Sequence, residues 1–183
     1  SQPAVLFVKL FAYDTDGDYL GSFNLGDALL NNPSGMTPTN IRKWLAVNGH
    51  LYAAIGSDQG GFVLRWVNDP QSAEYPFEFE IVGALDNGSG AELAFHEGRL
   101  FVSTWPGGEL GGQNGGDLAG LFMSPPVPPT GGLPASSDQW TKVWQVDAYE
   151  PDPVIAGTYG GSALASFDGY LYWGTMHVPL TSF

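Results

Sequence analysis

Apolar residues recur along this chain in short runs that are separated by glycine-rich or Asn/Asp-Gly turns. The runs lack the 3.6-residue period of an amphipathic helix, so the pattern predicts β-strands joined by tight turns. One phrase occurs three times, at residues 45–55, 93–104 and 164–175. Each copy is an apolar run, a turn ending in glycine, a Leu-aromatic pair and a strand of small residues. Such self-similarity indicates a repeated structural unit.

The first two copies continue in the same way, with a Gly-Gly pair and further apolar strands. Each of these units therefore predicts four short strands, with hairpin turns at Asn48-Gly49 and Glu97-Gly98. The additional strands expected are Phe62–Trp66, Phe77–Ile81, Leu118–Phe122 and Trp140–Trp144.

Four-stranded antiparallel units at this spacing are typical of β-propeller blades, and about three blades are represented here. The near-continuous apolar runs suit strands that are buried on both faces. Ala54, Ser103 and Gly174 share one aligned position, and small residues there fit the crowded region near a propeller axis. A β-sandwich with accidental similarity between hairpins is the alternative.

The repeat divides the chain into four parts. Residues 41–88 and 89–156 are expected to be complete blades, the second with long Gly-rich and Pro-rich loops. Residues 1–40 would supply the third and fourth strands of an incomplete blade plus a linker, and 157–183 the first two strands of another. We expect that the chain does not close a ring alone. It would belong to a longer polypeptide, the favoured alternative, or pair with a second copy as a homo-oligomer.

The phrase around Phe167–Thr175 and the Gly60–Arg65 strand resemble the repeat of kelch-like bacterial β-propellers of secreted and cell-surface proteins. The resemblance covers roughly residues 41–175, and the second unit departs from it with Leu-Phe where Val-x-Arg is expected. It implies a fold and an extracellular, cell-surface or periplasmic location, and no catalytic residue.

The composition of the chain narrows the classes of partner that it is expected to bind. The net charge is −13, from 6 basic and 19 acidic residues, which disfavours nucleic acid. No apolar stretch approaches the length of a membrane helix, so no membrane span is expected. The chain has no cysteine and therefore neither a disulfide nor a thiolate metal site.

Asp14, Asp16 and Asp18 form the sharpest local motif, since carboxylates at alternate positions resemble the start of a Ca²⁺ loop. The pattern then departs from such a loop, with Tyr19 and Leu25 where Gly and a bidentate Glu belong. A hairpin turn with Asp-Gly at its tip is the favoured interpretation, and Ca²⁺ the candidate cofactor.

The loop 105–117 is the main candidate for ligand contacts, because Glu109, Asn114 and Asp117 offer oxygen donors and Trp105 an aromatic face. Trp173 could also stack on a sugar, although packing between blades is the favoured role for both tryptophans. The following Ser124–Thr130 segment is expected to be a polyproline II connector.

Glu92 is a weak candidate for acid–base catalysis, because it falls on a strand expected to line the channel. Its aligned positions are Trp44 and Ala163, and the sequence shows no partner for it. We therefore expect a non-enzymatic β-propeller binding or assembly module, with protein or carbohydrate partners held by rim loops. The alternatives are a polysaccharide lyase or hydrolase and a structural subunit of a surface layer or fibre.

Overall fold

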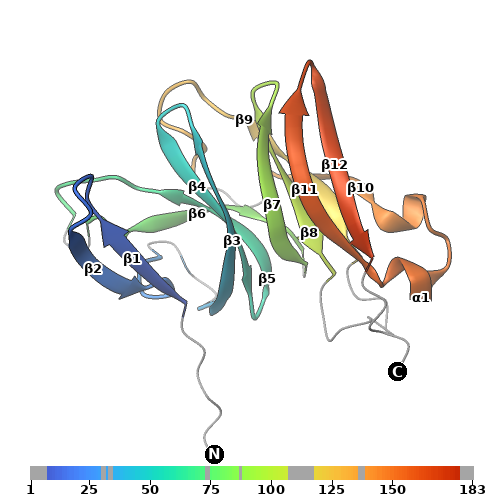
Figure 1. Cartoon of the computed structure of the whole chain (residues 1–183), viewed down its shortest axis with the longest axis horizontal. Helices are drawn as coiled ribbons and strands as arrows, with labels where there is room; N and C mark the ends of the chain where they lie inside the picture. Colours follow the sequence, from blue (N-terminus) through green and yellow to red (C-terminus); the bar gives the residue numbers. More distant parts are fainter. Residues whose placement is uncertain are drawn as a thin grey trace, which may run out of the picture.

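The computed structural model describes residues 8–29, 32, 35–72, 75–86, 88–106, 118–135 and 139–177. Almost all the regular structure in these ranges is β-strand (Figure 1). The strands form two four-stranded antiparallel sheets and two separate hairpins. The prediction of an all-β chain with four-stranded antiparallel sheets is thereby confirmed.

Each four-stranded sheet is a meander in which every strand pairs with the next one along the chain. The first sheet contains β3 (Pro38–Val47), β4 (His50–Ser57), β5 (Gly60–Trp66) and β6 (Phe79–Ala84). The second contains β7 (Ser89–His96), β8 (Arg99–Trp105), β9 (Gly120–Pro126) and β10 (Thr141–Gln145).

One hairpin precedes the two sheets and one follows them. The first hairpin is β1 (Lys9–Tyr13) with β2 (Tyr19–Asn24), and the last is β11 (Tyr159–Phe167) with β12 (Tyr170–His177). The 3-10 turn η1 (Val146–Ala148) and the one-turn helix α1 (Pro153–Ala156) lie between β10 and β11. Asp152 caps that helix, since its Oδ1 accepts from the backbone N–H groups of Val154 and Ile155.

The turns of the repeated phrase share one backbone geometry. Asn48, Glu97 and Asp168 have φ of 51°, 45° and 49°, and the glycine after each has φ of 78° or 79°. Two successive positive φ angles define the type I′ turn, whose twist matches that of the flanking strands. The turns expected at Asn48-Gly49 and Glu97-Gly98 are confirmed.

The connector expected from Ser124 onward is wrong at its start, because Ser124, Pro125 and Pro126 belong to β9. Pro125 and Pro126 are the last two residues of β9 and face the register shift between Arg99 and Phe101. The Leu100 backbone N–H at this irregularity donates to Ser124 Oγ at 2.9 Å. β9 also begins at Gly120, two residues later than expected.

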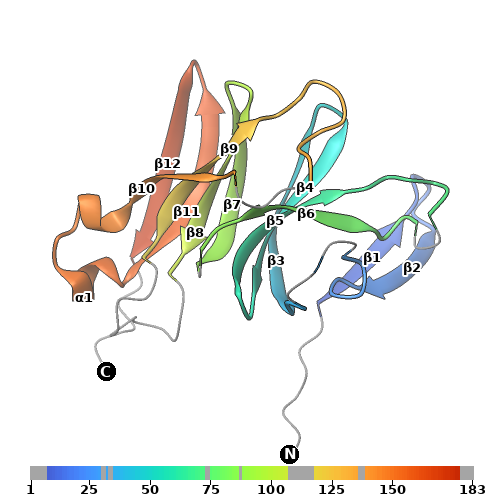
Figure 2. The ribbon, with the colours of Figure 1, turned by 180° about the vertical axis from the view of Figure 1, so that it is seen from behind.

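The sheets stack face to face along the chain, with β3 against β7 and β7 against β11. Figure 2 shows the same succession from behind. Alternate residues of β4 point into two different clusters: Tyr52 and Ala54 pack toward the β7–β10 sheet, whereas Ala53 and Ile55 pack toward the β1–β2 hairpin. The strand β4 is therefore buried on both faces, as expected for a near-continuous apolar run.

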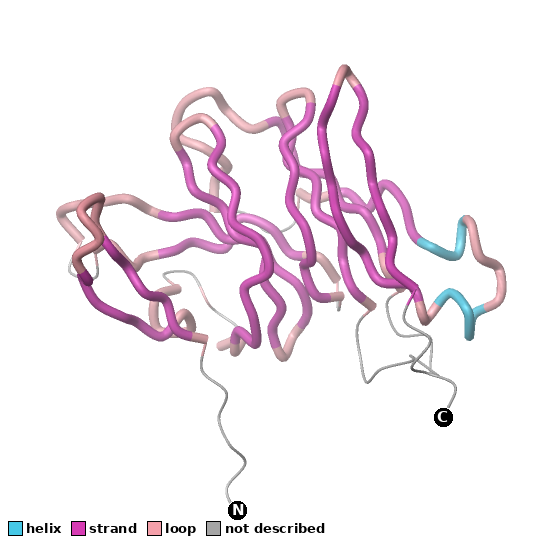
Figure 3. The backbone as a smooth tube through the Cα atoms, in the orientation of Figure 1, coloured by secondary structure: helices cyan, strands magenta, loops and turns pink. Residues whose placement is uncertain are grey.

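The two hairpins lie at opposite ends of this stack (Figures 1 and 3). Within the described residues, β1 is hydrogen-bonded only to β2 and β12 only to β11. The described strands close neither a barrel nor a ring.

Candidate functional site

Two glycines on first strands, Gly90 and Gly161, make close contacts with the backbone of the preceding sheet. A Cβ at Gly90 of β7 would lie 3.0 Å from the Ile55 carbonyl oxygen and 3.3 Å from Ala54 Cβ. A Cβ at Gly161 of β11 would lie 2.5 Å from the Thr104 carbonyl oxygen and 2.9 Å from Ser103 Cβ. The backbones approach so closely that only glycine fits without a shift.

Strand pairing shows that these two contacts are equivalent. Gly90 pairs with Thr104 and Gly161 with Thr175, while Ile41 of β3 pairs with Ile55. In all three pairs the register shifts immediately after this residue, which marks a β-bulge at the same place. The same inter-sheet contact therefore occurs twice, and Ile41 holds the corresponding position on the first sheet.

Glu92 has a partner that the sequence did not reveal. Its Oε1 lies 2.8 Å from Lys43 Nζ, so the carboxylate on β7 is ion-paired to the adjacent strand β3. The alignment of Glu92 with Trp44 is wrong by one residue, because Lys43 pairs with Ala54 as Glu92 pairs with Ser103. The first copy of the phrase is one residue shorter before its turn, which caused the slip.

The two candidate tryptophans both pack between sheets. The Arg42 guanidinium lies 4.8 Å from the centre of the Trp105 ring, and a Cβ at Gly160 would touch that ring at 3.4 Å. The Trp173 ring meets Trp144 edge-on, with ring centres 4.4 Å apart. Both rings are half-buried in these contacts.

Asp14 organises the β1–β2 turn. Its Oδ1 accepts from the backbone N–H groups of Asp16 at 3.0 Å and Asp18 at 2.9 Å, and Gly17 has φ of +86°. These bonds are those of a self-capping hairpin turn. Across the described ranges, no group of three or more His, Cys, Asp or Glu side chains is placed to hold a metal ion. Glu109, Asn114 and Asp117 lie outside the described residues.

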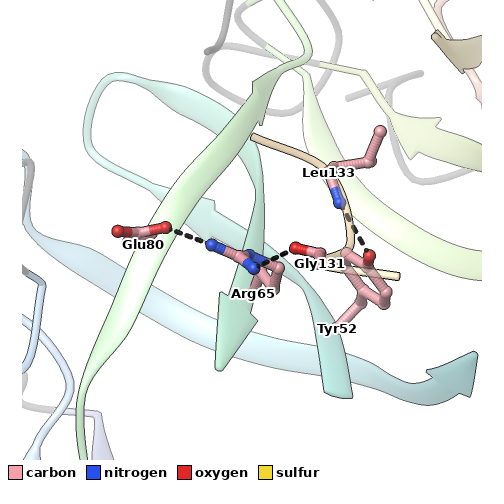
Figure 4. Close-up of polar contacts among 5 residues, drawn as sticks. All are labelled: Tyr52, Arg65, Glu80, Gly131 and Leu133. Carbon is pink, nitrogen blue, oxygen red and sulfur yellow. Dashed lines mark hydrogen bonds and ion pairs between the residues drawn. The ribbon is translucent and has the colours of Figure 1, made fainter. Parts of the chain in front are cut away.

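A polar clamp that the sequence did not indicate joins the two four-stranded sheets (Figure 4). The Leu133 backbone N–H donates to Tyr52 Oη at 3.0 Å, and Arg65 Nη1 donates to the Gly131 carbonyl at 2.6 Å. Arg65 Nη2 also pairs with Glu80 Oε2 at 2.6 Å. The connection between β9 and β10 is thus held against the preceding sheet.

Tyr52 is fully buried in this clamp. Burial raises the pKa of its phenol above the usual value of 10.0, and the Leu133 hydrogen bond and the Arg65 charge partly oppose this rise. The phenol is therefore a neutral structural anchor at ordinary pH. Trp140 adds a second anchor, since its Nε1 donates to the Val82 carbonyl at 2.8 Å.

An apolar cleft of about 620 Å³ lies between the β1–β2 hairpin and the face of the β3–β6 sheet. Aromatic and aliphatic side chains dominate its lining, among them Phe11, Leu20, Ile41, Trp44 and Tyr75. Trp44 is 40% exposed there and packs against Phe79, with ring centres 5.8 Å apart. No local sequence pattern indicates this cleft, because its walls come from separate strands.

No family model matches the chain, and no curated protein or solved structure is significantly similar to it. Within the described ranges, no helix has the length and apolarity needed to cross a membrane.

Proposed function

We propose that the chain is a non-enzymatic β-propeller binding or assembly module. The observation that carries this proposal is the recurrence of one inter-sheet contact, with Gly90 on Ile55 and Gly161 on Thr104. A contact that repeats from sheet to sheet is what radial stacking of blades requires. The first strands β3, β7 and β11 lie next to one another, as strands around a propeller axis do.

The state of Glu92 favours a binding role over catalysis. A general acid or base needs access to a substrate proton, and Glu92 is held by Lys43 at 2.8 Å. The large exposed groups of the two terminal hairpins are apolar or aromatic, which suits binding. A polysaccharide lyase or hydrolase is the competing function. It would be favoured if the protein released products from polysaccharides and the Glu92→Gln substitution abolished this release.

Four parts of the proposal rest on the sequence. The composition and the kelch-like resemblance support three of them. These are contacts through the rim loop 105–117, a carbohydrate or protein as partner, and a location outside the cytoplasm. Calcium binding at Asp14, Asp16 and Asp18 is tested by melting the protein with millimolar Ca²⁺ and with a chelator, since a ligand of the folded state raises stability. Identical melting curves would leave the hairpin turn as the sole role of these residues.

A high-resolution structure of the protein in its assembled state tests the proposed architecture. The proposal expects four-stranded sheets arranged radially around one axis, with Lys43 and Glu92 on strands near that axis. A closed β-sandwich would overturn it. A linear stack of sheets extending from molecule to molecule would instead support the fibre or surface-layer alternative.

A further inference from the structure

The outer face of the β11–β12 hairpin is open and apolar. Four large side chains are exposed on it: Phe167 by 70%, Tyr170 by 66%, Tyr172 by 55% and Met176 by 41%. Tyr172 pairs with Ala165 as Phe101 pairs with Ala94 and Tyr52 with Leu45, so it holds the position of the buried Tyr52. In each of the two central sheets, the equivalent face is covered by the next strands along the stack.

The opposite end of the stack offers a matching space. Within the described residues, the β1–β2 hairpin has two strands where each central sheet has four. The cleft beside β1 is bounded by Ile41 and Trp44 of β3. In the closed interfaces, the equivalent residues lie against the first two strands of the preceding sheet. Gly90 and Leu93 of β7 hold the positions of Ile41 and Trp44, and both pack toward β4. The cleft is therefore the place for a two-stranded hairpin.

Side-chain sizes show which hairpin fits. In the closed interfaces a residue with a Cβ, Ala54 or Ser103, faces a glycine. On β12 the equivalent residue is Gly174, which precedes Thr175 as Ser103 precedes Thr104. If this hairpin packed against β3, Ile41 would face Gly174. The larger residue would then lie on the first strand and the glycine on the second strand of the preceding sheet, which is the reverse of the closed interfaces. Among the described residues, a Cβ at Gly174 would meet only the Ala163 carbonyl oxygen, at 3.8 Å, so this side of Gly174 is open within that part of the chain.

An exchange of this kind already occurs between the two closed interfaces. A Cβ at Gly56 would run into Ser89, whereas at the next interface Trp105 holds the position of Gly56 and faces Gly160. Charge also permits the contact. The β11–β12 segment carries one carboxylate, Asp168, although the chain has a net charge of −13. Two copies can therefore meet at this face with little repulsion.

We propose that the β11–β12 hairpin of one copy docks in the cleft beside β1 of a second copy, so that two chains complete each other. The edge of β12 then pairs with the edge of β1, and the two hairpins form a four-stranded sheet in the order β11, β12, β1, β2. Each copy contributes both ends, so two copies make two such contacts and close a ring. This inference rests on the proposed stacking of sheets and names the partner that completes it.

Sedimentation equilibrium of the full chain tests the proposal. The wild type is expected at twice the 19.5 kDa mass of one chain. Gly174→Val fills the space meant for Ile41 and should weaken each contact about 10- to 100-fold, leaving monomers. Valine suits an exposed strand position, so the variant should fold, which its melting temperature checks. Trp44→Glu should remove the other side of the contact.

Mixing these two variants gives the decisive control. Each alone lacks both contacts, but the mixture retains one, between the β12 face of Trp44→Glu and the cleft of Gly174→Val. The mixture should therefore form dimers that neither variant forms alone. A second control, Ile41→Gly with Gly174→Ala, rebuilds the arrangement of Gly90 and Ala54 and should retain the dimer.

Two results would overturn the inference. One is a dimer that persists in both variants, and the other is a wild-type chain that stays monomeric at every concentration. A monomer whose tryptophan fluorescence responds to oligosaccharides, with a response that Trp44→Glu abolishes, would identify carbohydrate as the occupant instead. If the wild type is monomeric and Gly161→Ala still lowers its stability strongly, docking of a second copy is rejected but the stacking of sheets within one chain is not. If Gly161→Ala is harmless as well, the stacked-sheet proposal fails too.

Discussion

The two central sheets and the two terminal hairpins have the same strand chemistry but different surroundings. Tyr52 on β4 is fully buried, whereas Tyr172 at the equivalent position of β12 is 55% exposed. Gly161 has backbone atoms of the preceding sheet against it, whereas a Cβ at Gly174 would have no described atom closer than 3.8 Å. The difference shows that burial comes from the neighbouring sheet rather than from the strand itself. Pairs of matched substitutions can therefore measure what stacking contributes.

The largest difference is expected between Gly161→Ala and Gly174→Ala. The new methyl at residue 161 would overlap the Thr104 backbone and force the sheets apart, which should lower the free energy of unfolding by about 3 kcal/mol. The methyl at residue 174 meets nothing close, so we expect a change within about 0.5 kcal/mol in the monomer. Urea denaturation measures both, and equal losses would contradict the repeated contact.

Tyr52→Phe should have the next largest effect, because it leaves the buried Leu133 N–H without an acceptor. We expect a loss of about 1–3 kcal/mol in thermal or chemical unfolding. Tyr172→Phe is the matched control and should change little, since its ring is exposed. Similar losses in the two variants would show that the clamp does not hold the sheets together.

The Tyr52 pKa adds a pH test of the same clamp. Because the folded-state pKa is raised, the folded protein holds the phenolic proton more tightly than the unfolded chain does. This contribution is complete below pH 10 and is lost as the pH rises through the higher folded-state pKa. The fall in stability above pH 10 should thus be shallower in Tyr52→Phe than in the wild type, and parallel curves would argue against it.

Asp14→Ala should have a smaller effect, confined to the first hairpin. The substitution removes the acceptor for two backbone N–H groups in an exposed turn, and we expect a loss of about 1 kcal/mol. Asp16→Ala serves as the control because no described bond uses its carboxylate to hold the turn. Equal effects of the two substitutions would point to a shared role, such as a common bound cation.

Lys43→Met should have the smallest effect. The Lys43–Glu92 pair is partly exposed, with side chains 41% and 24% accessible, and such pairs contribute less than about 1 kcal/mol. The loss should shrink further in high salt because the exposed charges are screened. A loss above about 2 kcal/mol would mean that the pair is desolvated in the assembled state.

The repeated turns could be predicted from sequence because their cause is local. Asn48-Gly49 and Asp168-Gly169 contain the residues that a type I′ turn demands. The register was less accessible, since one missing residue before Gly49 shifted the position aligned with Glu92 from Lys43 to Trp44. Bulges add further shifts that no local pattern reveals.

The clamp and the cleft could not be predicted because they join distant parts of the chain. Tyr52 and Leu133 are separated by 81 positions, and their bond depends on how the β9–β10 connection crosses to the preceding sheet. The tryptophans illustrate a different point. The sequence offers two roles for Trp105 and Trp173, packing and ligand stacking, with packing favoured. The assembled sheets place Gly160 against the Trp105 ring and Trp144 against the Trp173 ring.

Hydrogen–deuterium exchange on the unmodified protein tests most directly whether the centre is closed and the ends are open. In dilute solution, the amides of β4 and β8 should be strongly protected, while the free edges of β1 and β12 exchange much faster. At high protein concentration, protection should rise at β1 and β12 and stay constant at β4 and β8. If β12 is as protected as β8 in dilute solution, or if concentration changes nothing, the open-ended stack is contradicted.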